Sequence, residues 1–317
     1  MNYQITQCQM LAPSIKEIVL APLTQPALAP CETAGAHFKW WMPELEQWRH
    51  YSRVELAGHD LPPGSLAFAI RLHPDSASSA YIRQLQAGDQ VRLDGPFHAF
   101  DYCLDDSDGA DIALAGGIGI TPLTGILGQL RGRQRPARLH YFAKSAGDAA
   151  YATELRELLQ DDLSLHCSDS AAGRPSVATV LGQLQPRDRL YVCGPQAMLN
   201  DVFSHAQAQG FPRERIHFEI FNTTLAEDEA GFAVQATDSG IEFQVRPDQS
   251  LLDALEEAGL EPLYDCRRGE CGVCELEVLE GEVEHRDFIM SPQQAACSNK
   301  IYPCVSRAKS PSLKLVI

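Results

Sequence analysis

The chain of 317 residues is 44% hydrophobic and 21% charged, and its formal net charge is −16. This length and composition predict a globular chain of two or three domains. The negative charge argues against non-specific binding to nucleic acid or to anionic membranes. Residues 1–5 do not form a basic region followed by an apolar run, and no window reaches the length of a membrane span. We therefore expect a cytoplasmic location, where most of the ten cysteines stay reduced.

Residues 1–103 predict a first domain built mainly from short strands. Four segments have strand character and are separated by Pro, Gly and Asp: 15–20, 37–42, 65–72 and 90–93. The segment 80–85 is the helical exception. Several short strands without long helices favour a small antiparallel β-barrel.

Within this domain, the segment Arg49-His50-Tyr51-Ser52 is a candidate ligand site. Alternate residues of a strand share a face, so Arg49 and Tyr51 would project together, with Ser52 turned the other way or offering its backbone. An arginine grips a phosphate with its planar fork, and a tyrosine ring stacks on a flat heterocycle. Both residue types are also common on exposed strands, so an ordinary exposed strand is the alternative.

Residues 104–224 predict a second domain in which strands and helices alternate. An apolar strand at 111–115 leads into Gly116-Gly117-Ile118-Gly119-Ile120-Thr121-Pro122 and then an amphipathic helix at about 123–130. We expect Thr121 to be the N-cap of this helix and Pro122 to lie in its first turn. Free N–H groups and the helix dipole favour an anion at such a turn, which therefore suits a pyrophosphate.

The spacing of these glycines is not the G-x-G-x-x-G of the Rossmann motif. The next strand, 138–142, ends in Ala143-Lys144-Ser145, and no acidic residue stands at the place that matches the Rossmann pattern. The turn is therefore either a nucleotide site of another type or a plain tight turn between a strand and a helix.

A similar arrangement recurs later in this domain. A strand at 190–192 is followed by Cys193-Gly194-Pro195 and by a helix at 196–209 that Gly210 stops. Two such turns at the carboxyl ends of strands frame a crevice, where open α/β sheets bind ligands. A buried structural role for Cys193 is the alternative. The domain closes with a strand at 216–221.

The polar, aperiodic stretch 222–230 predicts a linker, which we place at 225–230, before a third domain at 231–317. Strands at 232–237 and 241–245 flank a hairpin turn. Ser250 and Asp253 predict the start of a helix that ends at Gly259. Later strands are expected at 275–279 and 313–317.

Four cysteines of the third domain have the spacing of plant-type iron–sulfur ligands. Cys266, Cys271 and Cys274 form C-x4-C-x2-C, and Cys304 follows 30 positions after the third. A structural zinc site favours two C-x2-C pairs, and a thioredoxin-like pair opens a helix, whereas here the loop leads into a strand. The spacing therefore favours a 2Fe–2S cluster, with Cys297 outside the ligand set.

Together these parts resemble the phthalate dioxygenase reductase type of Rieske-oxygenase reductase, which includes vanillate demethylase and carnitine monooxygenase reductase components. Besides the segments above, the resemblance is carried by residues 281–287 and 304–309 and covers almost the whole chain. It implies a multidomain fold with an antiparallel β-barrel flavin domain, an α/β nucleotide-binding domain of ferredoxin reductase type and an α+β β-grasp 2Fe–2S ferredoxin domain.

The resemblance also implies a role for each motif of the flavin domain. Arg49 would hold the flavin phosphate, Tyr51 would pack on the isoalloxazine ring and Ser52 would lie near its reactive nitrogen. The family has Leu where this chain has Arg53, and a Gly-Gly-Ser phosphate segment where this chain has Ser76-Ala77-Ser78-Ser79. Ser79 could still reach the phosphate, and the flavin implied is FMN.

In the nucleotide domain, the resemblance makes one group of residues the pyrophosphate turn: Gly116, Gly117, Gly119 and Thr121. Cys193, Gly194 and Pro195 would border the nicotinamide, and Phe221 would cover the ring from the other side. Ser52 and Cys193 are then the catalytic residues beside the reacting atoms. The cofactor implied is NADH, although Lys144 with Ser145 could accommodate the 2′-phosphate of NADPH.

The function implied is electron transfer with a change of electron number. A nicotinamide gives up two electrons as a hydride and a 2Fe–2S cluster takes one at a time, so a flavin must hold the second. The sequence predicts transfer from NADH through FMN and the cluster to a Rieske-type oxygenase, by a monomeric reductase without nucleic-acid or membrane partners. We expect Arg267 and Arg268 to form part of the dock. The alternative is a ferredoxin-type carrier with a non-catalytic N-terminal region.

Overall fold

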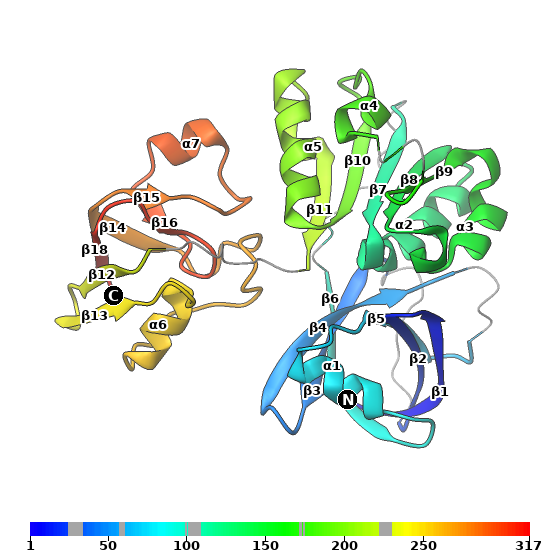
Figure 1. The fold of residues 1–317 in the computed structure, drawn as a ribbon, viewed down its shortest axis with the longest axis horizontal. Helices are drawn as coiled ribbons and strands as arrows, with labels where there is room; N and C mark the ends of the chain where they lie inside the picture. The colour runs from blue at the N-terminus through cyan, green and yellow to red at the C-terminus, as the bar shows by residue number, and fades with distance from the viewer. Residues whose placement is uncertain are drawn as a thin grey trace. The chain divides into compact units, whose positions relative to one another are not determined.

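The computed structural model describes residues 1–24, 34–56, 61–98, 100, 109–170, 173, 175–221 and 230–317. The chain divides into two compact units, Met1–Glu219 and Ile220–Ile317, and each is described by itself (Figure 1). The predicted boundary at 103/104 and the predicted linker, apart from Ala230, lie outside the described residues. No helix in the described part of the chain is long and apolar enough to cross a membrane.

The first part of the first unit is a closed antiparallel barrel with the strand order β1-β2-β5-β4-β3-β6. Its elements are β1 (Asn2–Ala12), β2 (Ile15–Pro22), β3 (Ala36–Met42), β4 (Gln47–Val54), β5 (Leu66–Arg71), α1 (Ala77–Gln84) and β6 (Gln90–His98). Phe38, Trp40 and Phe68 are fully buried inside it, and their rings pack edge to face. This core supports β4, which carries the predicted ligand segment.

The sequence did not predict β1, because its apolar side chains do not alternate regularly. Only Tyr3, Ile5 and Ala12 are buried, and the pairing with β2 shifts register between Ile5 and Gln7 and again between Met10 and Ala12. Each shift places consecutive residues on one face and so interrupts the period of two.

The second part of the first unit is a five-stranded sheet with the order β11-β10-β7-β8-β9, in which β7 pairs in parallel with β8 and β10, and β8 with β9. Its strands are β7 (Asp111–Gly116), β8 (Ala137–Ala143), β9 (Leu163–Cys167), β10 (Arg189–Gly194) and β11 (Ile216–Ile220). Its helices are α2 (Ile120–Gly132), α3 (Ala152–Leu159), α4 (Val177–Leu181) and α5 (Gln196–Ala208). The buried Asp111 carboxylate accepts hydrogen bonds from Arg135 and Arg189, which holds the amino end of β7.

The structure corrects the predicted start of α2. A 3₁₀ turn, Gly117–Gly119, runs directly into the helix, whose N-cap is Gly119 without a side-chain cap. Thr121 is therefore not the N-cap, and its hydroxyl donates to the Ile118 carbonyl oxygen at 3.0 Å. Because the glycine turn already has helical curvature, the helix begins before the residue that could have capped it. Pro122 does lie in the first turn.

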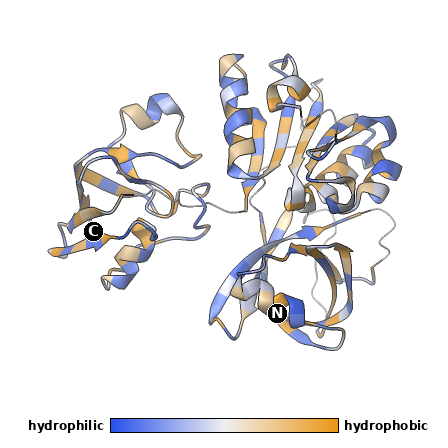
Figure 2. Cartoon of the chain, viewed as in Figure 1, coloured by the Kyte–Doolittle hydropathy of each residue, from blue (hydrophilic) through white to orange (hydrophobic). Residues whose placement is uncertain are grey.

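The second unit is built on a sheet with the order β13-β12-β18-β14-β16 and a small β15-β17 pair. Its elements are β12 (Phe232–Ala236), β13 (Ile241–Val245), α6 (Leu251–Glu257), β14 (Leu276–Glu280), β15 (Val283–Glu284), α7 (Pro292–Ala296), β16 (Lys300–Ile301), β17 (Arg307–Ala308) and β18 (Ser312–Val316). Leu251 and Leu255 of α6 belong to its core, and Ser250 caps α6 as predicted. Hydrophobic and hydrophilic residues alternate along many strands of both units (Figure 2).

Candidate functional site

Strand β4 places the predicted Arg49-Tyr51-Ser52 segment along the barrel wall. The half-buried Tyr51 ring packs edge-on against Trp40, with 5.7 Å between ring centroids, and burial raises the Tyr51 pKa to about 12. Arg49 lies on the surface, where its guanidinium donates to the Gln47 side-chain oxygen at 2.6 Å. The barrel core thus holds the tyrosine, while the guanidinium remains open to solvent.

The serine-rich segment before and within α1 lies beside Tyr51. Ser76 is the N-cap, and a hydrogen bond joins the side chains of Ser78 and Tyr51. Ser79 is buried, and its hydroxyl accepts a hydrogen bond from the His73 backbone N–H at 3.0 Å. The sequence pointed to Ser79, whereas Ser78 is the serine that contacts the tyrosine. The Ser76 N-cap pattern was the available signal, because it fixes the helix start at Ala77.

Ser52 is buried in the first unit and contacts a carboxylate that was not predicted from the sequence. Its hydroxyl donates to Glu219 of β11, with Oγ 3.1 Å from one carboxylate oxygen and 3.3 Å from the other. The His37 ring nitrogen Nδ1 lies 4.0 Å from the same carboxylate, and Glu219 is 1% exposed. A buried carboxylate requires such partners. Glu219 could have been found from the sequence, because it is a single glutamate within the apolar strand predicted at 216–221.

The two glycine turns of the sheet pack directly against each other. A Cβ on Gly116 would lie 2.5 Å from the Pro195 ring, and one on Gly119 would lie 2.1 Å from the Cys193 carbonyl oxygen. A Cβ on Gly194 would stand 3.0 Å from the Gly116 backbone. Only glycine permits this approach, so the carboxyl ends of β7 and β10 form one continuous backbone surface. Cys193 is fully buried within it.

A pocket of about 210 Å³ opens beside these turns. Its lining includes Gly116 and Gly117, Lys144 and Asp148 from the segment after β8, and Arg71 from the barrel. A Cβ on Gly117 would stand 3.2 Å from the Arg71 guanidinium. Arg71 was not found from the sequence because it enters the pocket from the barrel, and Asp148 was not found because the 3₁₀ turn Ala146–Asp148 after Ser145 was not predicted.

Asp148 is an acidic residue that follows strand β8, although it does not stand at the position of the Rossmann pattern. It stands four residues beyond Lys144, and the Ser145 hydroxyl donates to its carboxylate at 2.6 Å. The pocket therefore combines two cations, Arg71 and Lys144, with one carboxylate that is already hydrogen-bonded. This charge balance suits an anionic ligand, as the glycine turn predicts.

The four predicted ligand cysteines lie in the second unit as two close pairs. The Cys274 and Cys304 sulfurs are 3.4 Å apart, and the Cys266 and Cys271 thiols share a hydrogen bond. That bond lowers the Cys271 pKa to about 6. A two-iron cluster takes two thiolates on each iron, so two pairs fit this ligand set. In the described part of the chain no three Cys, His, Asp or Glu side chains are grouped around a single-ion position.

The loop between these cysteines is closely packed on one side. A Cβ on Gly269 would lie 2.6 Å from a Val305 methyl group, and Gly269 has a φ of +73°. The backbone N–H of Arg268 points to the Cys266 sulfur at 3.3 Å. Small residues therefore let the backbone approach the sulfurs, and such N–H groups help to set the potential of a cluster.

The predicted docking role of the two loop arginines is wrong for Arg268. It is 8% exposed, and its guanidinium lies 2.7 Å from the Glu270 carboxylate. Arg267 is exposed, but it is ion-paired with Asp253 and Glu256 of α6. Sequence spacing could not show which of two adjacent arginines turns inward. A substitution of Arg268 would break this buried ion pair, so its effect could not be attributed to docking.

Comparison with known proteins identifies the family. The family described as "2Fe-2S iron-sulfur cluster binding domain" matches residues 234–309. The chain is 33% identical over 311 residues to the heme-dependent oxidative N-demethylase beta subunit of Ectopseudomonas mendocina (strain ymp), covering 97% of this chain and 96% of the relative. It is 30% identical over 319 residues to the carnitine monooxygenase reductase subunit of Escherichia coli (strain K12), covering 98% and 97%.

A solved structure of phthalate dioxygenase reductase, described as modular and as transferring electrons from pyridine nucleotides to 2Fe–2S, has a TM-score of 0.69 and 28% identity. The match covers 100% of this chain and 98% of that one. The chain belongs to the phthalate dioxygenase reductase-type family of oxygenase reductases. The predicted fold class is confirmed, and so is the predicted reaction. The reductase passes electrons from a pyridine nucleotide through a flavin to a 2Fe–2S cluster in an oxygenase system.

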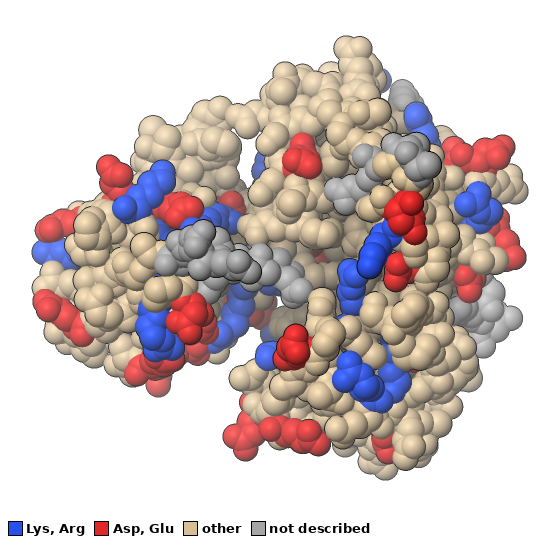
Figure 3. Space-filling model, in the orientation of Figure 1, with Lys and Arg blue, Asp and Glu red and all other residues tan. Residues whose placement is uncertain are grey.

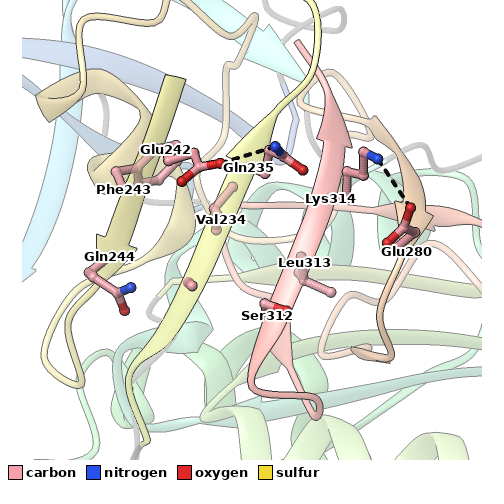
Figure 4. A pocket seen from close by; sticks show the side chains of 10 residues that line it. Val234, Gln235, Glu242, Phe243, Gln244, Glu280, Ser312, Leu313 and Lys314 are labelled. Carbon is pink, nitrogen blue, oxygen red and sulfur yellow. Dashed lines mark hydrogen bonds and ion pairs between the residues drawn. The ribbon is translucent and has the colours of Figure 1, made fainter. Parts of the chain in front are cut away.

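A second pocket of the reductase, of about 370 Å³, lies on the sheet of the second unit (Figure 4). It is lined mainly by residues of β12, β13 and β18, and hydrogen bonds or ion pairs join Gln235 to Glu242 and Glu280 to Lys314 along it. Its polar side chains are those of an exposed sheet face, and none of the four cysteines lines it. We assign it no role in electron transfer.

Proposed function

We propose that this reductase uses NADH and FMN and delivers single electrons from its cluster to a Rieske-type oxygenase component. The observation that carries the proposal is the arrangement of four cysteines as two thiol pairs in a chain that also holds the flavin and nucleotide motifs. When bound, the flavin accepts a hydride and releases single electrons to the cluster. The residues of this chain bind, orient and shield these groups.

The barrel residues would hold the flavin. The solvent-facing Arg49 guanidinium and the N-terminus of α1, with Ser76 and Ser78, are available for its phosphate. Tyr51, fixed by Trp40 and Ser78, offers a ring of set orientation for the isoalloxazine. Ser79 then acts indirectly, because its hydroxyl fixes the segment before α1. Because these residues form a binding site for one phosphate group, they favour FMN over FAD.

Ser52 would lie at the reactive edge of the flavin. Its hydroxyl can pass a proton, because it is hydrogen-bonded to the buried Glu219 carboxylate. His37 stands beside that carboxylate and can share its proton. The side chains of Ser52, Glu219 and His37 would therefore take up the proton that is released when a reduced flavin gives its two electrons to the cluster.

The pocket beside the glycine turns would hold the dinucleotide. Gly116, Gly117, Gly119 and Thr121 form the turn, and Arg71 reaches it from the barrel to contact the pyrophosphate. Asp148 can accept a ribose hydroxyl, which supports NADH as the donor, whereas Lys144 in the same pocket makes NADPH a weaker second donor. Cys193, Gly194 and Pro195 would border the nicotinamide.

Each thiol pair would hold one iron of the cluster: Cys266 with Cys271, and Cys274 with Cys304. The reductase family supports an oxygenase as the acceptor. One relative is a subunit of a heme-dependent oxidative N-demethylase, so a haem protein is the second candidate acceptor.

The net charge of −16 supports a reductase without nucleic-acid or membrane partners. Free cysteines among the described residues suit the cytoplasm, and we propose that the reductase is monomeric.

Anaerobic titration of the purified protein with NADH tests the proposal. Loss of flavin absorbance together with the rhombic paramagnetic resonance signal of a reduced 2Fe–2S cluster is the expected result. A cluster that dithionite reduces but that neither NADH nor NADPH reduces would support the carrier alternative and refute the reductase. Acid release of the flavin followed by chromatography distinguishes FMN from FAD.

A further inference from the structure

Most of the large apolar side chains that the second unit exposes are gathered at its cysteine loop. Among the described residues of this unit, four are exposed, by these fractions: Leu263 78%, Tyr264 41%, Val273 47% and Leu279 50%. Leu263 and Tyr264 stand three and two residues before the ligand Cys266, and Val273 lies between Cys271 and Cys274. We call Leu263, Tyr264 and Val273 the apolar rim.

The apolar rim and the exposed ligand lie on the same loop. Cys271 is exposed, whereas Cys266, Cys274 and Cys304 are buried. An electron that leaves the cluster for another protein crosses the shortest insulating layer beside the exposed sulfur. Apolar side chains at that place exclude water from a contact and let a partner approach closely.

The three side chains of the apolar rim contribute nothing to the hydrophobic cores of the second unit. They belong neither to the core around Leu251 and Leu255 nor to the smaller core around Tyr302. Tyr264 is nevertheless held in place, because the Arg267 guanidinium lies 4.2 Å from the centre of its ring. Exposed apolar side chains gathered on one loop in this way are typical of an interaction site.

The charge around the apolar rim indicates the chemistry of its partner. The two carboxylates paired with Arg267 neutralise its charge. Glu261 and Asp265 are exposed at the border of the rim. In Figure 3 acidic and basic side chains are interspersed over the second unit, without a continuous basic face on the side shown. The rim therefore complements an apolar patch bordered by Lys and Arg.

We propose that the apolar rim around Cys271 is the docking surface for the oxygenase component, which presents an apolar patch with a basic border next to its electron acceptor. The proposal rests on the proposed function, since it requires a cluster that NADH reduces. It replaces Arg268 with Leu263 and Val273 as the residues that an acceptor contacts.

Cytochrome c is the probe, because it is a basic one-electron acceptor with an exposed haem edge. Leu263→Ser and Val273→Ser, in the full chain with both cofactors, should each raise the KM for cytochrome c at least about fivefold, the loss typical of an interface anchor. Leu279→Ser is the matched control, since Leu279 belongs to the same unit and is about as exposed as Val273 but lies on β14. Calorimetric binding of cytochrome c at low salt should weaken in parallel, without any turnover.

The same variants must still show the wild-type cluster spectrum and the wild-type rate of cluster reduction by NADH. Equal cytochrome c kinetics and binding in the rim variants and the wild type would overturn the proposal. Slower NADH-dependent reduction of the cluster would also overturn it, because the rim would then serve transfer within the chain. A wild-type cluster that NADH does not reduce would refute the proposed function itself, which is a separate outcome.

Discussion

The Ser52 hydroxyl on β4 lies 3.1 Å from the buried Glu219 carboxylate on β11, so one hydrogen bond joins the barrel to the parallel sheet of the first unit. The bond has two consequences. It fixes the rotamer of the serine expected beside the flavin, and it connects this serine to a group that can hold a proton. His37 extends the connection by a further side chain.

We expect Glu219→Gln to slow reoxidation of the NADH-reduced flavin by the cluster about tenfold or more, because the amide keeps the shape of the carboxylate but cannot take up the proton that reoxidation releases. The KM for NADH should change little. Ser52→Ala should give a similar loss, and the double variant should be no worse than either single one, since both act in one chain of hydrogen bonds. Stopped-flow measurement of the flavin absorbance provides the rates. Glu214→Gln, at an exposed position shortly before β11, is the control, and an unaltered rate in Glu219→Gln would refute the proton role.

Arg71→Ala should weaken NADH binding. A hydrogen bond to a charged group contributes about 1.5–3 kcal/mol, so the KM for NADH should rise roughly tenfold to a hundredfold. The maximal rate should fall much less, because Arg71 contacts the pyrophosphate in this proposal and not the reacting ring. Reduction of the cluster by dithionite should be unchanged. Arg83→Ala, an exposed arginine on α1, controls for the loss of one positive charge, and an equal effect of both variants would remove Arg71 from the site.

The first unit should lose stability on acidification because of a histidine pair between β8 and β9. The Nδ1 atom of His140 lies 3.1 Å from Nε2 of His166, and burial, with His166 and Arg138 nearby, lowers the His140 pKa from 6.5 to about 4. Burial lowers the His166 pKa as well. Between pH 6.5 and 4 the unfolded chain binds protons that the folded chain does not, so stability decreases as the pH falls through this window.

His140→Phe should remove part of this pH dependence, on the order of 1 kcal/mol after allowance for the partial exposure of the pair. Urea unfolding at pH 7 and pH 5 measures it as the difference in unfolding free energy between the two conditions. His98→Gln, at an exposed position on the barrel, should leave the difference as in the wild type. A pH dependence that His140→Phe does not alter would show that other groups cause it.

Tyr151→Phe should destabilise the first unit by about 1–3 kcal/mol. The Tyr151 hydroxyl donates at 2.6 Å to Glu17 of β2, which is 2% exposed, so the substitution removes one partner of a buried carboxylate. Gln9 remains as a donor to Glu17, which limits the loss. Thermal unfolding measures the effect, and Tyr81→Phe, at a partly buried position on α1, is the control. Equal unfolding temperatures for Tyr151→Phe and the wild type would show that the hydrogen bond contributes no stability.

Those parts of the reductase that depend on local spacing could be predicted from the sequence. The ligands Cys266, Cys271 and Cys274 stand on one loop, so their spacing along the chain is enough to predict that they bind one cluster. The turn at Gly116 and the turn at Gly194 were found because tight turns require particular residues. That these two turns touch each other could be expected from parallel strands, but the close contacts needed the structure.

The residues that were missed come together only through the fold. Glu219 is 167 positions from Ser52, and Arg71 reaches the glycine turn from the barrel. No periodicity in the chain connects such pairs, since the strand order of the barrel and of the sheet brings them together. Arg267 and Arg268 show a second limit. Two adjacent residues of the same type cannot be distinguished by the local sequence pattern. The packing of the folded chain decides which of the two is buried.

The buried ion pair between Arg268 and Glu270 should influence the reduction potential of the cluster. Their charged groups lie 2.7 Å apart, both side chains are less than 10% exposed, and Arg268 also donates its backbone N–H to the Cys266 sulfur. Reduction adds one negative charge, so Glu270→Gln should raise the potential and Arg268→Gln should lower it, each by on the order of 50 mV. The double variant should return close to the wild-type value. Redox titration at pH 8, followed by paramagnetic resonance, measures the potentials, with the exposed Arg246→Gln as the control. Shifts of the same sign in both single variants would show that loop packing, and not charge, determines the potential.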